Sequence, residues 1–361
     1  MVSDTPASPD KYRIISLDGG GLRTLVGLGI LRRIEQERPG FLDAVQLVAG
    51  ASAGAISALI LAAAPRPSEG LKAARDLWFT PGLFTKPLRH QLGALVGRTA
   101  LLPNEAMARA LTGVLGGKTL KDLQRHVVIP AFQLDAPAPR APVNAPARSA
   151  PDPCAWPDEQ EPRAWRPRVF HNLRGKDEAD TFVKEEDLLV DLALRSSASP
   201  IVSPVYQGYV DGALFANNPT LAAIAQVRWA EATAMNDLLV LSLGTGNAMN
   251  HMKGYNESWG YTRWLLDRHQ PMALLAASIE ANVEAIAFQT QKLLPQGNTL
   301  RVNPPMPSKL GNNVEQQVSN IDKYVECFDL TQTLEWVDTS GWMSPHRAQA
   351  PLTEEIGTPP R

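Results

Sequence analysis

The feature that most constrains the fold occurs twice near the start of the chain: a short apolar run, a tight turn and a helical run. Residues 12–17 (YRIISL) are rich in β-formers, three glycines follow at 19–21, and a helical periodicity of leucines comes next. Residues 44–49 (AVQLVA) are typical of a buried strand, and AISALILAAA, after the small turn at 50–54, is typical of a helix. Two successive strand–turn–helix units favour parallel strands covered by helices.

The same alternation continues along the chain. Strand character returns at residues 125–133, 169–171 and 237–242, and helical patterns cover 71–115, 185–195 and 259–294. The sequence therefore predicts an α/β fold, a three-layer α/β/α arrangement with a mainly parallel central sheet. We expect a core domain at residues 10–250, a mainly helical C-terminal part at 251–340 packed on that core, and a flexible tail at 341–361.

The composition changes abruptly between residues 136 and 168, where nine of the chain's 30 prolines lie. Such a density of proline disfavours regular structure. We therefore expect an extended or mobile insertion within the core domain.

Composition and charge narrow the class of protein. With 35 basic and 37 acidic residues the formal net charge is -2, which indicates no nucleic-acid partner and leaves only local, apolar contact with a membrane. Cys154 and Cys327 are the only cysteines, and their separate contexts indicate neither a disulfide framework nor a metal site. The most apolar stretch, residues 53–64, is too short to cross a bilayer, and the N-terminus lacks the apolar region of a secretory signal. We expect a cytoplasmic protein with at most peripheral membrane contact.

Gly50, Ser52 and Gly54 form a G-x-S-x-G pentapeptide. In this motif the serine occupies a sharp turn between a strand and a helix, so that its hydroxyl is exposed at the top of a sheet. The motif alone is weak, but here a strand pattern leads in and a helical pattern leads out, as the turn requires. The start of a helix also favours negative charge at a reacting centre. Ser52 is therefore the candidate nucleophile.

The three glycines at residues 19–21 can turn bare backbone N–H groups toward an oxyanion, and Arg23 adds a positive charge nearby. A purely structural turn explains the same glycines equally well. A dinucleotide-binding fingerprint is rejected because Thr24 stands where its third glycine belongs. Residues 112–119 (TGVLGGKT) likewise lack the first glycine of a phosphate-binding loop.

A serine nucleophile needs a base, and none of the six histidines offers a clear candidate. His126 and His171 lie beside or within expected strands, and the other four lie in polar or irregular surroundings. Asp211 ends a short β-type run, and Gly212 allows a sharp turn after it. An Asp-Gly pair by itself usually marks only a turn, so these residues alone leave the base open.

Taken together and in order, three blocks resemble the signatures of patatin-like phospholipases: DGGGLR at 18–23, GASAG at 50–54 and VDGALFANNP at 210–219. LALRSSASPIVSP at 192–204 and LSLGTG at 241–246 also resemble segments of that family. The resemblance spans roughly residues 12 to 250, and the combination is far more specific than any single block.

The resemblance implies a Ser-Asp dyad in place of a triad, with Ser52 as nucleophile and Asp211 as general base. It further implies a set of supporting residues: oxyanion donors at Gly19, Gly20 and Gly21, support from Arg23, and turn-forming glycines at Gly50, Gly54 and Gly212. The enzyme would be a serine acyl hydrolase that cleaves fatty acyl esters of phospholipids or glycerolipids through an acyl-enzyme. Because the family is generally calcium-independent, the resemblance implies no cofactor and no metal. Its partners would be a lipid or ester substrate and, transiently, a membrane surface.

Two departures and two alternatives remain. Thr24 stands where many relatives have glycine, and the proline-rich insertion has no counterpart in the pattern; Trp156 and Trp165 suggest a lid, although a plain surface loop is the simpler interpretation. One alternative function is an acyltransferase, which would need a histidine that this chain does not offer. The other is a nucleotide-regulated phospholipase effector of bacterial antiviral defence, controlled by residues 250–361, where no nucleotide signature is visible.

Overall fold

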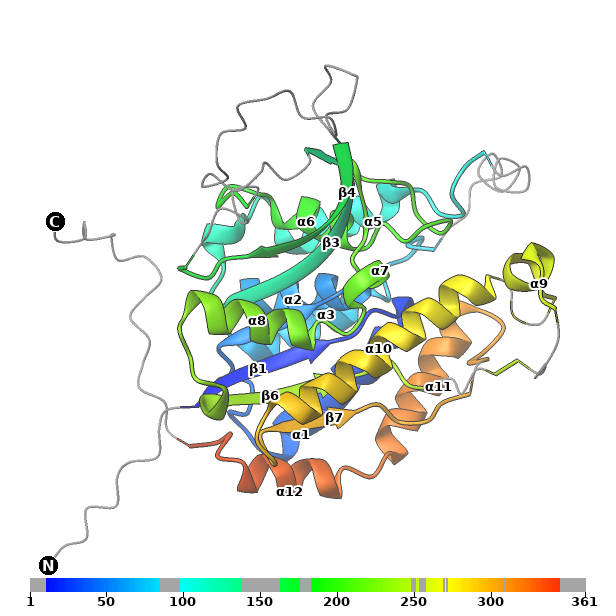
Figure 1. Cartoon of the computed structure of the whole chain (residues 1–361). Coiled ribbons are helices and arrows are strands. Elements are labelled where there is room, and N and C mark those ends of the chain that lie inside the picture. Colours follow the sequence, from blue (N-terminus) through cyan, green and yellow to red (C-terminus); the bar gives the residue numbers. More distant parts are fainter. Residues whose placement is uncertain are drawn as a thin grey trace, which may run out of the picture.

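The computed structural model describes residues 11–84, 98–137, 163–175, 183–247, 251–252, 258–268, 270, 272–307 and 309–344. Within these ranges one seven-stranded sheet has the order β4-β3-β2-β1-β6-β7, with β5 paired to β3 (Figure 1). The strands are β1 (Tyr12–Leu17), β2 (Leu47–Gly50), β3 (His126–Pro137), β4 (Arg163–His171), β5 (Tyr209–Asp211), β6 (Leu238–Leu243) and β7 (Thr299–Val302).

The centre of the sheet is parallel and its β3 side is antiparallel. β1 pairs in parallel with β2 and β6, β2 with β3, and β6 with β7, whereas β4 and β5 both run antiparallel to β3. Parallel strands end together, so the turns after β1, β2 and β6 meet at one edge of the sheet, the usual place for a site in such folds.

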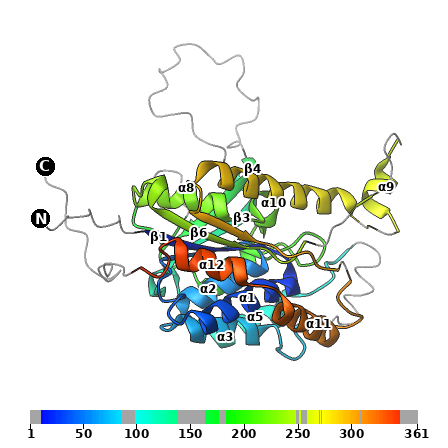
Figure 2. The same ribbon diagram turned by 90° about the horizontal axis from the view of Figure 1, so that it is seen from below.

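Helices cover both faces of the sheet, which confirms the predicted α/β fold. They are α1 (Thr24–Glu37), α2 (Ala53–Ala63), α3 (Pro67–Leu77), α5 (Asn104–Leu115), α6 (Leu189–Ser196), α7 (Ala213–Ala216), α8 (Thr220–Ala230), α9 (Tyr261–Leu266), α10 (Ala273–Leu293), α11 (Val314–Cys327) and α12 (Thr331–Thr339). In Figure 2, α8 and α10 lie on one face, and α1, α2, α3, α5, α11 and α12 lie on the other. β1 serves both layers, since Ile14 packs with the α8 side and Ile15 with the α1 and α2 side.

Strands extend into both ends of the expected proline-rich insertion. β3 runs on to Pro137 and β4 begins at Arg163, and the two strands pair with Ala136 opposite Ala164. Proline is tolerated here because β4 is an edge strand, where a missing N–H group breaks no ladder on the open side. The interior of the insertion, including Trp156, lies outside the described residues.

Helix boundaries also differ from the expected ones. The helix expected at 185–195 begins at Leu189, and the helix expected at 259–294 is divided into α9 and α10. Met272, at the N-cap of α10, has a φ of 59°, a left-handed conformation that an uninterrupted helix cannot contain.

The C-terminal part contributes to the core as well as covering it. β7 extends the sheet. Residues 341–344, expected to belong to the tail, lie against Arg13 near the beginning of β1. Trp342 is fully buried and stacks on Phe41 with ring centroids 4.9 Å apart. The buried Arg13 guanidinium on β1 donates to the Trp342 carbonyl at 2.6 Å and to the Ser344 carbonyl at 2.8 Å. The rest of the expected tail lies outside the described residues.

Candidate active site

Ser52 lies on the turn between β2 and α2, as the pentapeptide predicts. Its φ of 54° and ψ of -124° are strained for a residue with a side chain, and such strain persists only where surrounding contacts hold it. The flanking glycines are required by space: a Cβ atom on Gly50 would lie 2.1 Å from the carbonyl oxygen of Gly54, and one on Gly54 would lie 2.3 Å from that of Leu17. The turn therefore presses directly against the end of β1.

Asp211 ends β5 and faces Ser52. Its backbone is fixed by pairing with Ala131 of β3 and by an N–H bond to the Ala198 carbonyl at 3.0 Å. The Ser52 hydroxyl donates to Oδ2 of Asp211 at 2.6 Å, and the Ala213 N–H donates to Oδ1 at 2.9 Å. Both carboxylate oxygens are thus occupied, and one holds the serine proton.

Gly212 follows Asp211 at a position that has no room for a side chain. A Cβ atom there would lie 2.2 Å from the carbonyl oxygen of Pro130 on β3, so a side chain would push β5 away from its partner. The close approach is needed to hold Asp211 against the serine.

Burial changes the acidity of Asp211, which is only 2% exposed. Burial, opposed by the hydrogen bonds from the Ser52 hydroxyl and the Ala213 N–H, raises the pKa of Asp211 to about 6. A carboxylate with this pKa is mostly ionised at neutral pH yet binds a proton far more readily than an ordinary aspartate. These are the properties of a general base.

The glycine turn after β1 lies beside Ser52, but its three N–H groups are not equivalent. The Gly19 N–H donates to the Asn217 carbonyl at 3.0 Å, and the Asn217 side chain donates back to the Gly19 carbonyl at 3.2 Å. In the described part of the chain, the N–H groups of Gly20 and Gly21 donate to no protein acceptor. The donors expected at all three glycines are therefore reduced to two, because Gly19 is occupied.

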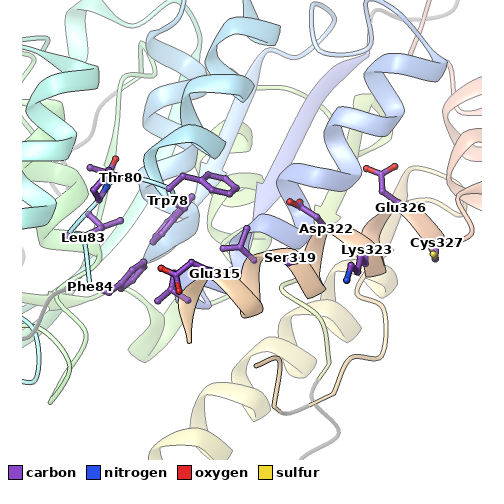
Figure 3. A pocket seen from close by; sticks show the side chains of 15 residues that line it. Trp78, Thr80, Leu83, Phe84, Glu315, Ser319, Asp322, Lys323, Glu326 and Cys327 are labelled. Carbon is purple, nitrogen blue, oxygen red and sulfur yellow. The ribbon is translucent and has the colours of Figure 1, made fainter. Parts of the chain in front are cut away.

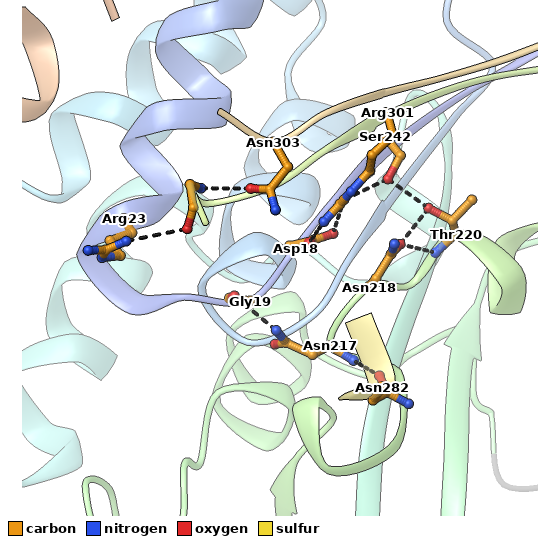
Figure 4. Close-up of polar contacts among 11 residues, drawn as sticks. Asp18, Gly19, Arg23, Asn217, Asn218, Thr220, Ser242, Asn282, Arg301 and Asn303 are labelled. Atoms are coloured by element: carbon orange, nitrogen blue, oxygen red, sulfur yellow. Dashed lines mark hydrogen bonds and ion pairs between the residues drawn. The ribbon is translucent and has the colours of Figure 1, made fainter. Parts of the chain in front are cut away.

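Arg23 contacts the loops that follow β6 and β7. Its guanidinium donates to the Gly246 carbonyl at 3.3 Å, as Figure 4 shows, and to the Pro307 carbonyl at 2.6 Å. Arg23 therefore supports the glycine turn from behind, through those loops.

An ion pair next to the glycine turn could not be found from the sequence. Asp18, the last residue before the glycines, is buried and forms a bidentate ion pair with Arg301 of β7, with one N–O distance of 2.9 Å (Figure 4). Arg301 also donates to the Ser242 hydroxyl of β6 at 2.8 Å. The ion pair joins three adjacent strands at the point where the glycine turn begins.

Ser196 is a further residue that the sequence does not single out. Its hydroxyl donates to the Pro130 carbonyl at 2.6 Å and accepts the Ser52 N–H at 3.2 Å. Located at the end of α6, it bonds the backbone of Ser52 and so helps to hold the strained turn. Only its proximity in three dimensions reveals this contact.

The histidines that the structure places in the sheet lie away from the dyad. His126 begins β3 and bonds the Tyr12 hydroxyl at 2.7 Å, at the opposite end of the strands from Ser52. Burial, aided by the charges of Arg174 and His171, lowers the pKa of His126 to about 4. His126 therefore has the character of a neutral core residue.

A pocket of about 340 Å³ opens over the dyad. Its floor contains the three glycines, Ser52 and Asp211, and its walls are largely apolar, with Ile56, Met107 and Leu194 among them. This combination of a few polar groups and apolar walls is typical of a site for a small or elongated apolar ligand.

A larger groove of about 910 Å³ adjoins this pocket, and Trp78, Leu83 and Phe84 line both (Figure 3). Its other side is α11, which presents Asp322 and Glu326, each already paired with an arginine. The groove holds none of the residues expected in the site, so its greater size does not make it the reaction centre.

Two kinds of feature are absent from the described residues. No group of three or more His, Cys, Asp or Glu side chains there is arranged to hold a metal ion. None of the described helices has both the length and the apolar character that crossing a membrane requires.

Comparison with known proteins identifies the family to which the chain belongs. The family model for patatin-like phospholipases matches residues 15–224. Protein teg of Priestia megaterium is 29% identical over 69% of this chain and 68% of its own length, and the putative sporulation hydrolase CotR of Bacillus subtilis is 28% identical over the same shares. Patatin-like protein 1 of Oryza sativa subsp. indica is 25% identical over 82% of this chain and 75% of its own.

Among solved structures, VipD from Legionella pneumophila matches with a TM-score of 0.39 and 13% identity, over 92% of this chain and 68% of that one. That likeness is too weak to support an argument, whereas the family model covers more than half of the chain. The protein belongs to the patatin-like phospholipase family, a family of esterases and lipases. The family resemblance expected from the three sequence blocks is confirmed.

Proposed function

We propose that the protein is a serine acyl hydrolase that cleaves fatty acyl esters of phospholipids or glycerolipids through a Ser52–Asp211 dyad. The observation that carries the proposal is the 2.6 Å bond from the Ser52 hydroxyl to a buried carboxylate, formed on a strained strand-to-helix turn. The membership of the family and the apolar walls of the pocket support an acyl substrate.

The chemistry proceeds in two halves. Asp211 takes the Ser52 proton while the serine oxygen attacks the ester carbonyl, and the alcohol leaves with a proton from Asp211. Water, deprotonated by Asp211, then releases the fatty acid and restores the serine. The N–H groups of Gly20, Gly21 and Ala53 are the candidates for stabilising the oxyanion, Ala53 because it follows the nucleophile at the start of α2.

Replacing each member of the dyad tests the proposal. Ser52→Ala removes the nucleophile, and Asp211→Asn keeps the shape but cannot accept the proton, so each should lower kcat/KM by at least about 10³-fold. Ester hydrolysis is followed without calcium, with a short-chain chromogenic ester and with phospholipid vesicles.

The matched control is Ser57→Ala, on the same helix, whose buried hydroxyl bonds only the Ala53 carbonyl of its own helix. Hydrolysis by this variant should stay within about twofold of wild type. Full activity of Asp211→Asn would place the base elsewhere, and a wild type inactive on every ester would contradict the proposed reaction.

A further inference from the structure

Two loops at the mouth of the pocket expose aliphatic side chains to solvent. Leu101 is 39% exposed, Ile201 51%, Val202 39% and Val205 53%. The loops are joined, because the N–H groups of Leu101 and Leu102 donate to the carbonyls of Ile201 and Val202 at 2.9 and 2.8 Å. We call the four exposed residues, Leu101, Ile201, Val202 and Val205, the apolar lip.

The lip is continuous with the pocket over the dyad. Leu102 and Val202 line that pocket, whereas Ile201 and Val205, in the same loop as Val202, do not. Among the described residues that line the pocket, Asp211 is the only charged one, so a ligand that entered beside the lip would meet uncharged side chains on its way to the dyad.

The stretches of the two loops that carry the lip have no charge. Residues 99–103 (TALLP) and 196–206 (SSASPIVSPVY) contain no acidic, basic or histidine residue. Exposed aliphatic groups without charged neighbours are unusual on a soluble surface and mark a place where an apolar partner is bound.

The backbone at the tip of the lip is strained. Ile201 has a φ of 72°, in a region that a β-branched residue rarely adopts. Asparagine or glycine would fit that conformation at lower energy, so neither backbone geometry nor water solubility favours isoleucine there. Strain at an exposed position is typical of functional sites, and here it projects an aliphatic side chain outward.

We infer that the apolar lip inserts into the surface of an uncharged or zwitterionic lipid layer and thereby places the mouth of the pocket against its substrate. The choice of a lipid partner rests on the proposed function. The absence of charge at residues 99–103 and 196–206 favours insertion by burial of apolar area over attraction to anionic headgroups. Binding should therefore change little between about 0.1 M and 1 M salt.

The test measures binding without turnover. In a Ser52→Ala background, Ile201→Asn together with Val205→Ser should weaken sedimentation with phosphatidylcholine vesicles about tenfold or more, because two apolar groups are lost. Asparagine tolerates the left-handed conformation, so the loop should keep its fold. In the Ser52 protein, the same pair of changes should leave kcat/KM for a soluble short-chain ester unchanged, since neither side chain lines the pocket.

The matched control is Trp229→Ser. Trp229 is 64% exposed on α8, away from the pocket, and its loss should leave vesicle binding unchanged. The inference is overturned if the lip variant binds vesicles as the parent does, if Trp229→Ser weakens binding equally, or if binding needs anionic lipid and low salt. Sedimentation velocity that shows a dimer in the parent and a monomer in the lip variant would identify the lip as a contact between copies instead.

The two proposals fail separately. Vesicle binding by Ser52→Ala requires no catalysis, so a chain that binds vesicles through the lip but hydrolyses no ester would contradict only the proposed function. A chain that hydrolyses soluble esters through the dyad but binds vesicles independently of the lip would contradict only this inference.

Discussion

A carboxylate that acts as a base must be free of its proton when the substrate arrives, and burial of Asp211 works against this. The hydrogen bonds from the Ser52 hydroxyl and the Ala213 N–H stabilise the ionised form and offset part of the effect of burial. The result is a pKa of about 6 for Asp211, close enough to neutrality for proton transfer in both directions. Under the proposed function, the environment of this single aspartate would do what a histidine does in a triad.

The first prediction concerns the pH profile. Hydrolysis of a soluble ester requires ionised Asp211, so log(kcat/KM) should rise with a slope of one below pH about 6 and level off above it. Initial rates between pH 4 and 9 would measure this. A midpoint near ~4, the ordinary value for aspartate, would show that burial does not control the base.

The same raised pKa has a consequence for stability, and its sign can be worked out. The folded pKa of Asp211 exceeds the unfolded one, so the proton stabilises the folded state; this contribution is full below the unfolded pKa of about 4 and is lost as the pH rises through about 6. Asp211→Asn cannot ionise. Its free energy of unfolding, relative to wild type, should therefore increase by about 1–3 kcal/mol between pH 4 and pH 8.

At this scale, local sequence predicts the residues proposed to react but not the residues that hold them in place. Ser52 and Asp211 stand in recognisable blocks, and the structure brings them together at 2.6 Å. Ser196 and Arg301 could not be predicted, because their roles come from contacts between segments far apart in the chain. The occupied N–H of Gly19 depends in the same way on the distant Asn217 carbonyl.

At the scale of elements, the turn between β2 and α2 brings the start of the helix into contact with the end of β1. The Ala51 N–H donates to the Leu17 carbonyl at 3.2 Å, and Gly54 faces the same oxygen with no room for a side chain. Gly50 and Gly54 leave room for the end of β1, the end of β2 and the start of α2 to meet, and this close approach fixes where the helix begins.

A third prediction compares two glycines. Gly54→Ala places a Cβ atom 2.3 Å from a backbone oxygen that cannot move without shifting β1, so it should destabilise the fold by about 3 kcal/mol or more. Gly113→Ala, in the exposed interior of α5 with nothing within 4 Å, should stabilise the fold by up to about 1 kcal/mol. Urea unfolding of both variants gives the two values, and equal effects would show that space at Gly54 is not limiting.

Helices and strands were predicted best where their own local sequence determines their secondary structure. The two strand–turn–helix units and the strand at 237–242 follow from periodicity and appear as β1, β2 and β6 with their helices. The ends of the proline-rich insertion were missed because a sheet edge tolerates proline, and edge position is set by topology. The strand β7 was missed because four residues pair only with a strand already in place.

At the scale of the whole molecule, the family match ends at residue 224, yet the site depends on residues well beyond that point. Arg301 forms an ion pair with the buried Asp18, which immediately precedes the glycine turn in sequence. Arg23 donates hydrogen bonds to the loops after β6 and β7. The C-terminal part therefore supports the glycine-turn side of the pocket, and damage to its packing should act on the whole fold.

The last prediction tests how far the C-terminal segment stabilises that fold. Trp342 is fully buried, stacks on Phe41 and donates its indole N–H to the Phe41 carbonyl at 3.1 Å, while its own carbonyl accepts from Arg13. Trp342→Ala would leave a cavity beside β1 and should lower the free energy of unfolding by about 3–5 kcal/mol. Met343→Ala, at the exposed neighbour, should lower it by less than about 1 kcal/mol. Chemical unfolding measures both values. A similar small loss of stability in the two variants would mean that residues 341–344 merely cover the core. A large loss for Trp342→Ala alone, with kcat/KM for a soluble ester retained in the folded variant, would show that these residues help to hold the core together.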